Sequence, residues 1–282
     1  PYDDILDLVD TYIGQVLTLN PSVEMDARQI RLSEAMFALG SMGDVRAAPR
    51  LQALSADPDS TISMGAMMAL SQLVPTPDAG FDLLDSALRD ADRSSAERAQ
   101  LLAVLGHTHH NRAVAVCRRI AEGGDELPIR YEATRRFYLL ATAAEARTFT
   151  APEDVPLHGG VETLVDLSAR CNDVPCFRDM LDPADTVAFE KAATMLIRLG
   201  DREESTVARL FDALRTADVQ VRMAATQAIN GLLTEPTAAQ AATLRRIVER
   251  AEEAELGRSS WHAVRGQLRS VVERVAMRVA PE

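Results

Sequence analysis

Two stretches of the sequence decide the fold: residues 59–70, DSTISMGAMMAL, and residues 218–229, DVQVRMAATQAI. When aligned, they agree at six places: an Asp, a β-branched residue, a Met, a small residue, an Ala and a final Ala-aliphatic pair. In both stretches the apolar residues recur at helical spacing, so each predicts an amphipathic helix with one buried stripe. Two such copies in one chain indicate internal repetition.

The pattern recurs with a nearly constant period. A clear third copy lies at residues 189–197, and weaker copies lie near residues 35–40, 101–106 and 129–133. The position of the central Ala, which we call the anchor, falls at Ala35, Ala66, Leu101, Ala133, Ala193 and Ala225, with steps of 31, 35, 32, 60 and 32 residues. The long step contains the Pro- and Gly-marked residues 148–160, and we interpret it as a degenerate repeat with a loop insertion.

Each repeat needs a second helix to cover its apolar stripe, and the sequence supplies one. Between the anchors, apolar residues follow one another at helical spacing. They are Ala47, Ala48, Leu51 and Leu54; Phe81, Leu84, Ala87 and Leu88; Val114, Cys117, Ile120 and Ala121; and Val207, Leu210, Phe211 and Leu214. Stacked helical hairpins would bury all these stripes. Aromatic residues make up only 4% of the chain, so we expect essentially no β-sheet.

This pattern resembles the HEAT family, and specifically the short bacterial form called the phycobilisome-lyase-type HEAT-like repeat. The resemblance covers about residues 22–235 and rests on Asp59, Ile62, Ala66, Ala69 and Leu70, and on Asp218, Val221, Arg222, Ala225, Ala228 and Ile229. It implies an all-α fold, a right-handed α-α superhelix of about seven helical hairpins. Residues 1–282 would form one domain: an N-terminal cap helix at 1–21, repeats at 22–147, the degenerate repeat at 148–183, repeats at 184–235 and capping helices at 236–282.

Charge narrows the class of partner. The formal net charge of −12 opposes a surface for nucleic acid or anionic membrane, because such surfaces need clustered Lys and Arg. No apolar run is long enough for a membrane span. The first 60 residues hold ten acids and four Arg, which favours a basic partner region. Lys191 is the only lysine among 30 basic residues, which favours a GC-rich bacterial genome.

One stretch departs from this acidity. Between residues 112 and 147 there are seven Arg and five acids. A basic patch for an acidic partner segment would consist of Arg118, Arg119, Arg130, Arg135 and Arg136. The alternative is an ordinary solvated helix face, which often carries such counts.

His107, His109 and His110 form the only local cluster of potential metal ligands, since imidazole is a common ligand for zinc. The cluster lacks a Cys or Glu pair at ligand spacing, so we favour a polar turn between two helices. Deoxyhypusine hydroxylases resemble this architecture but hold iron with His-Glu pairs, and no His here is followed by Glu. HEAT-like DNA glycosylases need a basic face with aromatic residues, which an acidic chain with one Trp fits poorly.

Cys171 and Cys176 flank a helix-breaking segment that could bring their sulfurs within disulfide reach, with two reduced thiols as the alternative. The resemblance to secreted or envelope HEAT proteins favours the disulfide, and with it the bacterial periplasm or envelope over the cytoplasm. The chain starts at Pro1 and not at Met, so the lack of a signal peptide does not argue for the cytosol. Cys117 lies on an apolar stripe and is predicted to be a core residue.

No phosphate-binding loop, Ser-His-Asp order or paired-carboxylate motif stands out. We therefore expect a non-catalytic protein-interaction scaffold without catalytic residues, cofactor or metal, which binds a protein partner through the concave face of the solenoid. Met64, Met67 and Met68 could line such a surface, although core packing is the commoner use of Met. The alternatives are an enzyme or cofactor handler, of the bilin lyase or metal-dependent type, and a structural module of a larger bacterial envelope complex.

Overall fold

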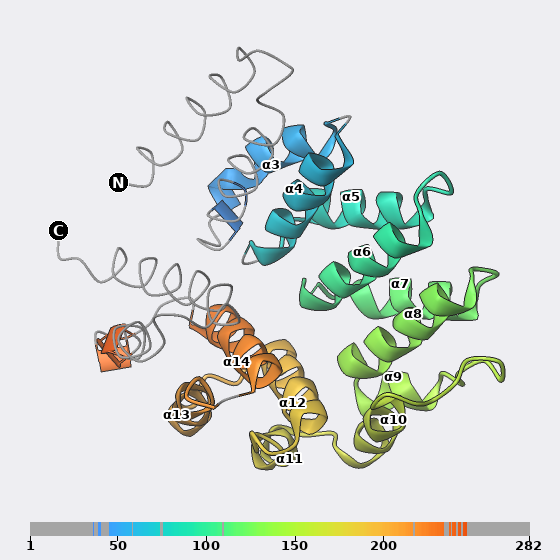
Figure 1. Cartoon of the computed structure of the whole chain (residues 1–282). Helices are drawn as coiled ribbons and strands as arrows, with labels where there is room; N and C mark the ends of the chain where they lie inside the picture. The colour runs from blue at the N-terminus through green and yellow to red at the C-terminus, as the bar shows by residue number, and fades with distance from the viewer. Residues whose placement is uncertain are drawn as a thin grey trace. The chain divides into compact units, whose positions relative to one another are not determined.

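The computed structural model of the chain describes residues 45–233 except 58, 74–75, 109 and 217, together with residues 36, 39–40 and several positions between 237 and 246 (Figure 1). The expected cap helix at 1–21 and most of the expected capping helices at 236–282 lie outside these residues. The chain divides into two compact units, residues 1–84 and 85–282, which are described separately.

All regular structure in the described part of the chain is helical, as the composition predicted. The helices are η1 (Val45–Ala47), α3 (Ala48–Ser55), α4 (Ser60–Gln72), α5 (Asp78–Arg89), α6 (Ser95–His107), α7 (Ala113–Glu122), α8 (Leu127–Leu140), α9 (Ala143–Arg147), α10 (Val161–Arg170), α11 (Val174–Asp179), α12 (Thr186–Leu199), α13 (Glu204–Ala213) and α14 (Val219–Leu232). η1 is a 3₁₀-helix and the other twelve are α-helices. The expectation of an all-α fold is confirmed for these residues.

The helices pack in the order in which they follow one another, as in a helical repeat. In the first unit α3 packs on α4 around Leu39, Leu51, Ile62 and Leu70. In the second unit α8 packs against α6 and α12, and α14 packs against α12 (Figure 1). The intervening helices α7, α11 and α13 pack on α8, α12 and α14. We call α4, α6, α8, α12 and α14 the anchor helices.

The described anchor residues are buried. The five that the structure describes are at most 2% exposed: Ala66, Leu101, Ala133, Ala193 and Ala225. A small side chain at this position lets two helix backbones approach closely. The sixth anchor, Ala35, lies outside the described residues. The apolar stripes predicted for the second helices are buried as well, apart from Leu54, which is half-buried.

The Asp of the repeat motif begins its anchor helix. Asp218 Oδ1 accepts hydrogen bonds from the backbone N–H groups of Gln220 and Val221, at 2.8 and 3.2 Å. Asp59 Oδ1 accepts one from Ile62 N–H at 3.4 Å. An N-cap carboxylate satisfies amide groups that the helix itself leaves unpaired, so this motif position carries an Asp for a backbone reason.

The fourth residue of an anchor helix closes its hairpin. In four anchor helices this residue donates a hydrogen bond to a backbone carbonyl near the end of the preceding helix, from its second-last residue to three residues beyond it. The pairs are Ser63 Oγ to Ser55 O (2.8 Å), Arg98 Nε to Leu88 O (3.0 Å), Arg130 Nε to Ala121 O (3.2 Å) and Arg222 Nη1 to Thr216 O (2.8 Å). The last carbonyls of a helix lack internal donors, and these side chains supply them. The repetition is therefore visible in hydrogen bonding as well as in the sequence.

The 60-residue step holds a loop and three short helices. α10 packs on α8, α9 and α12, while α8 and α12 contact each other directly. Cys171 and Cys176 flank the start of α11 and form a pair at disulfide distance, with Cα atoms 5.6 Å apart. Cys117 is fully buried in α7, and this burial raises its thiol pKa to about 12, as fits the predicted core role.

The single lysine joins α12 to the end of α8. The Lys191 side chain is completely buried, and its Nζ donates hydrogen bonds to Tyr138 O at 2.7 Å and Ala141 O at 2.6 Å. Two turns further along α12, Arg198 donates to Leu140 O and pairs with Glu145 at 3.3 Å. Burial lowers the pKa of Lys191 to about 7, and the positive charge of Arg198 adds to this effect. A neutral amine has two N–H donors, which match the two carbonyl acceptors.

Candidate partner-binding groove

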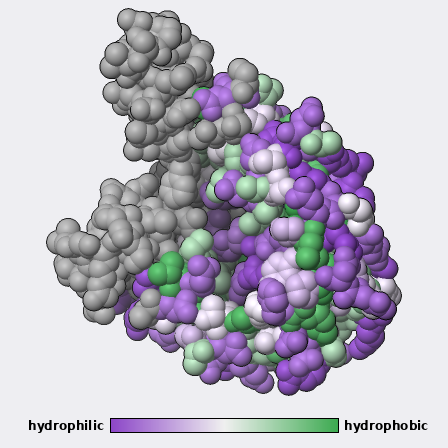
Figure 2. Space-filling model, turned by 45° about the vertical axis from the view of Figure 1, so that its right-hand side comes forward, coloured by the Kyte–Doolittle hydropathy of each residue, from purple (hydrophilic) through white to green (hydrophobic). Residues whose placement is uncertain are grey.

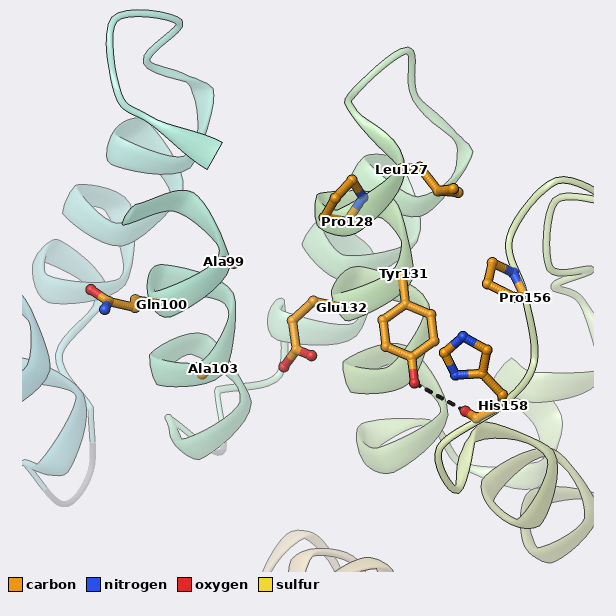
Figure 3. A pocket seen from close by; sticks show the side chains of 9 residues that line it. All are labelled: Ala99, Gln100, Ala103, Leu127, Pro128, Tyr131, Glu132, Pro156 and His158. Carbon is orange, nitrogen blue, oxygen red and sulfur yellow. Dashed lines mark hydrogen bonds between the residues drawn. The ribbon is translucent and has the colours of Figure 1, made fainter. Parts of the chain in front are cut away.

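An open groove lies between α6, α8 and the loop of residues 148–160, within the second unit (Figure 3). Its volume is about 540 Å³. Three groups of residues line it: Ala99, Gln100 and Ala103 from α6; Leu127, Pro128, Tyr131 and Glu132 from α8; and Pro156 and His158 from the loop. The lining is mostly apolar, with an amide, a carboxylate, a phenol and an imidazole as its polar groups.

The groove arises from a difference in side-chain size between two helices. On α6 the buried stripe contains Leu101, Leu102 and Leu105, which leaves Ala99 and Ala103 four residues apart on the face toward the groove. On α8 the larger side chains of Leu127 and Tyr131 have the same spacing. Because the alanines are short, the space between the two helices stays unfilled.

Leu127 is apolar and yet exposed. Its exposed fraction is 44%, and only Met68 and Leu199 are comparable among the large hydrophobic residues that the structure describes. The face of the molecule in Figure 2 is mainly hydrophilic, with apolar side chains gathered in small areas. Leu127 extends the mainly apolar lining of the groove, and a concave apolar surface with a few polar groups is typical of a binding site.

The inserted loop is fixed to the groove by one tyrosine. Tyr131 OH donates a hydrogen bond to His158 O at 3.0 Å, and the two rings lie 5.1 Å apart (Figure 3). The next residue, Gly159, has a φ of +61°, and a Cβ atom there would lie 2.7 Å from Tyr131 OH. Glycine is therefore required for both the backbone conformation and the close approach. The loop thus forms a defined wall of the groove.

Glu132 brings negative charge to the groove. Its Oε1 accepts a hydrogen bond from Arg136 Nε at 2.6 Å and lies 3.8 Å from Arg135 Nη1. Glu190 of α12 pairs with the same two arginines, at 2.9 Å and 3.8 Å. Glu132 Oε2 has no hydrogen-bond partner within the described part of the chain. One carboxylate oxygen is therefore held in place, while the other is available to a bound molecule.

A second carboxylate, that of Asp154, belongs to the loop of residues 148–160. Asp154 accepts two hydrogen bonds from Arg130, at 2.6 and 2.9 Å. The Arg130 hydrogen bond lowers the pKa of Asp154, so this group stays ionised well into the acid range. Arg130 in turn is committed to Asp154 and to Ala121 O.

The arginines of the predicted basic patch all form ion pairs inside the chain. Arg118 pairs with Glu122, Arg119 with Asp85, Arg130 with Asp154, and Arg135 and Arg136 with Glu132 and Glu190. The structure brings only Arg135 and Arg136 together around shared carboxylates. A role of these arginines in partner binding stays a prediction, and an acidic partner would compete with these internal carboxylates.

The histidine cluster lies at the end of α6. His107 is the last residue of that helix, His110 is half-buried after it, and His109 lies outside the described residues. Within the described residues no three His, Cys, Asp or Glu side chains are grouped as metal ligands would be. Of the three Met residues on α4, Met64 and Met67 are buried, whereas Met68 is 45% exposed.

Sequence reasoning did not find the groove. A signal for it exists in the two alanines of α6, which lie four residues apart outside the leucine stripe and face an exposed leucine one repeat later. That pattern is common in amphipathic helices, so it indicates a groove only when the packing of α6 on α8 is known.

No helix among the described residues has the length and apolar content that crossing a bilayer requires. No protein-family model matches the chain, and no curated protein matches it. Among solved structures, a crystal structure of an engineered protein covers 97% of both chains, at 15% sequence identity and a TM-score of 0.30. This likeness is too distant to assign a family, and the repeat-like character of the fold lies in the helix packing and hydrogen bonding described above.

Proposed function

We propose that the chain is a non-catalytic protein-interaction scaffold that binds a protein partner through the face of its anchor helices. The observation that carries this proposal is the groove between α6 and α8, an open and mainly apolar surface whose wall includes the exposed Leu127. Anchor helices and a glycine-dependent loop hold it in place, so a partner would meet a preformed surface that loses little conformational entropy on binding.

The finer fold assignment is part of the same proposal. We infer a right-handed solenoid of the HEAT-like type with about seven hairpins. It is supported by the Asp N-caps of Asp59 and Asp218, by the buried anchor residues and by the hairpin-closing donors at the fourth helix position. In such a solenoid the anchor helices line the concave side, and neighbouring repeats would extend the groove into a longer surface.

One observation supports a proposal for the cellular compartment of the protein. The Cys171–Cys176 pair at disulfide distance favours an oxidising location such as the bacterial periplasm or envelope. This location is also compatible with a structural role in a larger envelope complex.

Site-specific photocrosslinking in native cells tests the scaffold proposal. A photoreactive residue would replace Gln100, which is exposed in the groove, and in a control variant Ala115, which is exposed on α7. We expect a covalent adduct with a discrete partner at position 100 and none at position 115. Adducts at neither position, or only at 115, would contradict the proposal. A metal or chromophore that copurifies in stoichiometric amount would favour the enzyme alternative.

A further inference from the structure

We infer that the groove between α6 and α8 recognises a basic protein segment that carries one large apolar side chain. This inference rests on the proposed scaffold function and adds the chemistry of the partner. The apolar pocket and the charges around it are two independent properties of one surface.

Charge around the groove is strongly one-sided. The three segments that form its walls and approaches, residues 94–103, 124–132 and 151–160, contain six Asp or Glu and two Arg. Both arginines form ion pairs with carboxylates of these same segments and also donate to backbone carbonyls. Arg98 pairs with Asp125 at 2.6 Å and donates to Leu88 O, while Arg130 pairs with Asp154 and donates to Ala121 O.

Three of the six carboxylates are paired with arginines of the chain: Asp125 with Arg98, Asp154 with Arg130, and Glu132, through Oε1, with Arg136. The other three, Glu97, Glu126 and Glu153, give the approaches to the groove a net negative charge. Glu132 projects from α8 into the space beside α6 (Figure 3), and its Oε2 can accept a hydrogen bond from a Lys or Arg of the partner. A segment rich in Asp or Glu would meet repulsion at the same place.

The apolar part of the groove sets the second requirement. Ala99 and Ala103 form a shallow floor on α6, and Leu127 and Tyr131 form the opposite wall. A leucine-sized side chain would cover the exposed face of Leu127 and replace the missing bulk of the two alanines. A basic segment with only polar side chains would leave this surface in water and lose the gain from apolar burial.

Fluorescence anisotropy with short labelled peptides on the purified full chain tests the inference. The probes are a peptide of alternating Leu and Lys, a Ser/Lys peptide with the same charge, and a Leu/Glu peptide. We expect the Leu/Lys peptide to bind at least about tenfold more tightly than either of the others. Comparable binding of the Ser/Lys peptide would mean general attraction to an acidic protein and would overturn the inference.

Two variants locate the binding. Ala103→Leu fills the groove without changing charge or helix propensity, and Ala115→Leu makes the same change on the exposed side of α7. We expect Ala103→Leu to weaken Leu/Lys binding about tenfold and Ala115→Leu to leave it unchanged. Equal effects of the two variants would refute the groove as the binding site.

The same variant separates the two proposals. A native partner that crosslinks at position 100 and still binds Ala103→Leu as tightly as the wild type would leave the scaffold proposal intact and remove the groove inference. If no crosslink formed while the Leu/Lys peptide bound specifically, the groove inference would stand and the scaffold proposal would be refuted.

Discussion

Lys191 gives the sharpest test of the packing between α8 and α12. Its buried amine has a pKa of about 7 in the folded chain, against 10.5 for an exposed lysine. Between these two pH values the unfolded chain binds one more proton than the folded chain. The free energy of unfolding therefore rises with pH through this window, and the cost of burying the charged amine is fully present below pH 7. One pH unit corresponds to about 1.4 kcal/mol, so the whole window amounts to about 5 kcal/mol.

The substitution Lys191→Met removes the titrating group and keeps a side chain of similar shape. It also removes the donors to Tyr138 O, which retains a hydrogen bond from Ser168 at 3.1 Å, and to Ala141 O. The lost hydrogen bonds should cost about 1–3 kcal/mol at any pH. The titration should add a pH-dependent part, because the wild type gains about 2 kcal/mol relative to Lys191→Met between about pH 7.5 and 9.5.

Urea unfolding of both proteins across this pH range measures the difference. Other titrating groups, including the Cys117 thiol, are present in both proteins and cancel in the comparison. Parallel curves, with a constant difference between wild type and variant, would refute the argument that burial has lowered the pKa of Lys191.

Three further predictions concern the caps, the loop and the cysteines. Asp218→Ala removes the N-cap of α14 and should lower the free energy of unfolding by about 1–2 kcal/mol, measured in urea, with Asp218→Asn close to wild type. Gly159→Ala should separate the loop from Tyr131, lower the free energy of unfolding by about 1–2 kcal/mol and weaken Leu/Lys peptide binding to a matching degree. Wild-type stability and peptide affinity in this variant would mean that the loop is not a fixed wall of the groove. In protein from an oxidising compartment, Cys171 and Cys176 should resist alkylation until a reductant is added, and alkylation without reductant would show free thiols. Replacing both cysteines with Ser should lower the free energy of unfolding by about 2 kcal/mol.

The sequence predicted the repetition of this fold well, because repetition has a local cause. Asp59 and Asp218 of the two clearest motifs each cap a helix, and four of the five described anchors are alanines that allow close helix packing. Both positions are therefore constrained by the local backbone. Gly200 forms the left-handed C-cap of α12, with a φ of +68° that favours glycine. Features of this kind have local causes, so they can be predicted from a single sequence.

Features that depend on which helices meet could not be predicted. Gly106 lies in the last turn of α6, where a Cβ atom would be 2.8 Å from Arg136 Cδ. The glycine is there because a buried arginine of α8 crosses it, a contact between residues one repeat apart. The ion pairs that engage the predicted arginines, and the groove itself, depend on the same long-range packing, for which the sequence carries no periodic signal.

The burial of Lys191 also gives the chain an internal reporter of opening. No other lysine is present, so the chain has a single ε-amino group, and in the folded state that nitrogen is covered and hydrogen-bonded. An acylating reagent can reach it only while α12 separates from the end of α8. The rate at which the peptide containing residue 191 gains the mass of one acyl group would therefore report how often this part of the protein opens under native conditions.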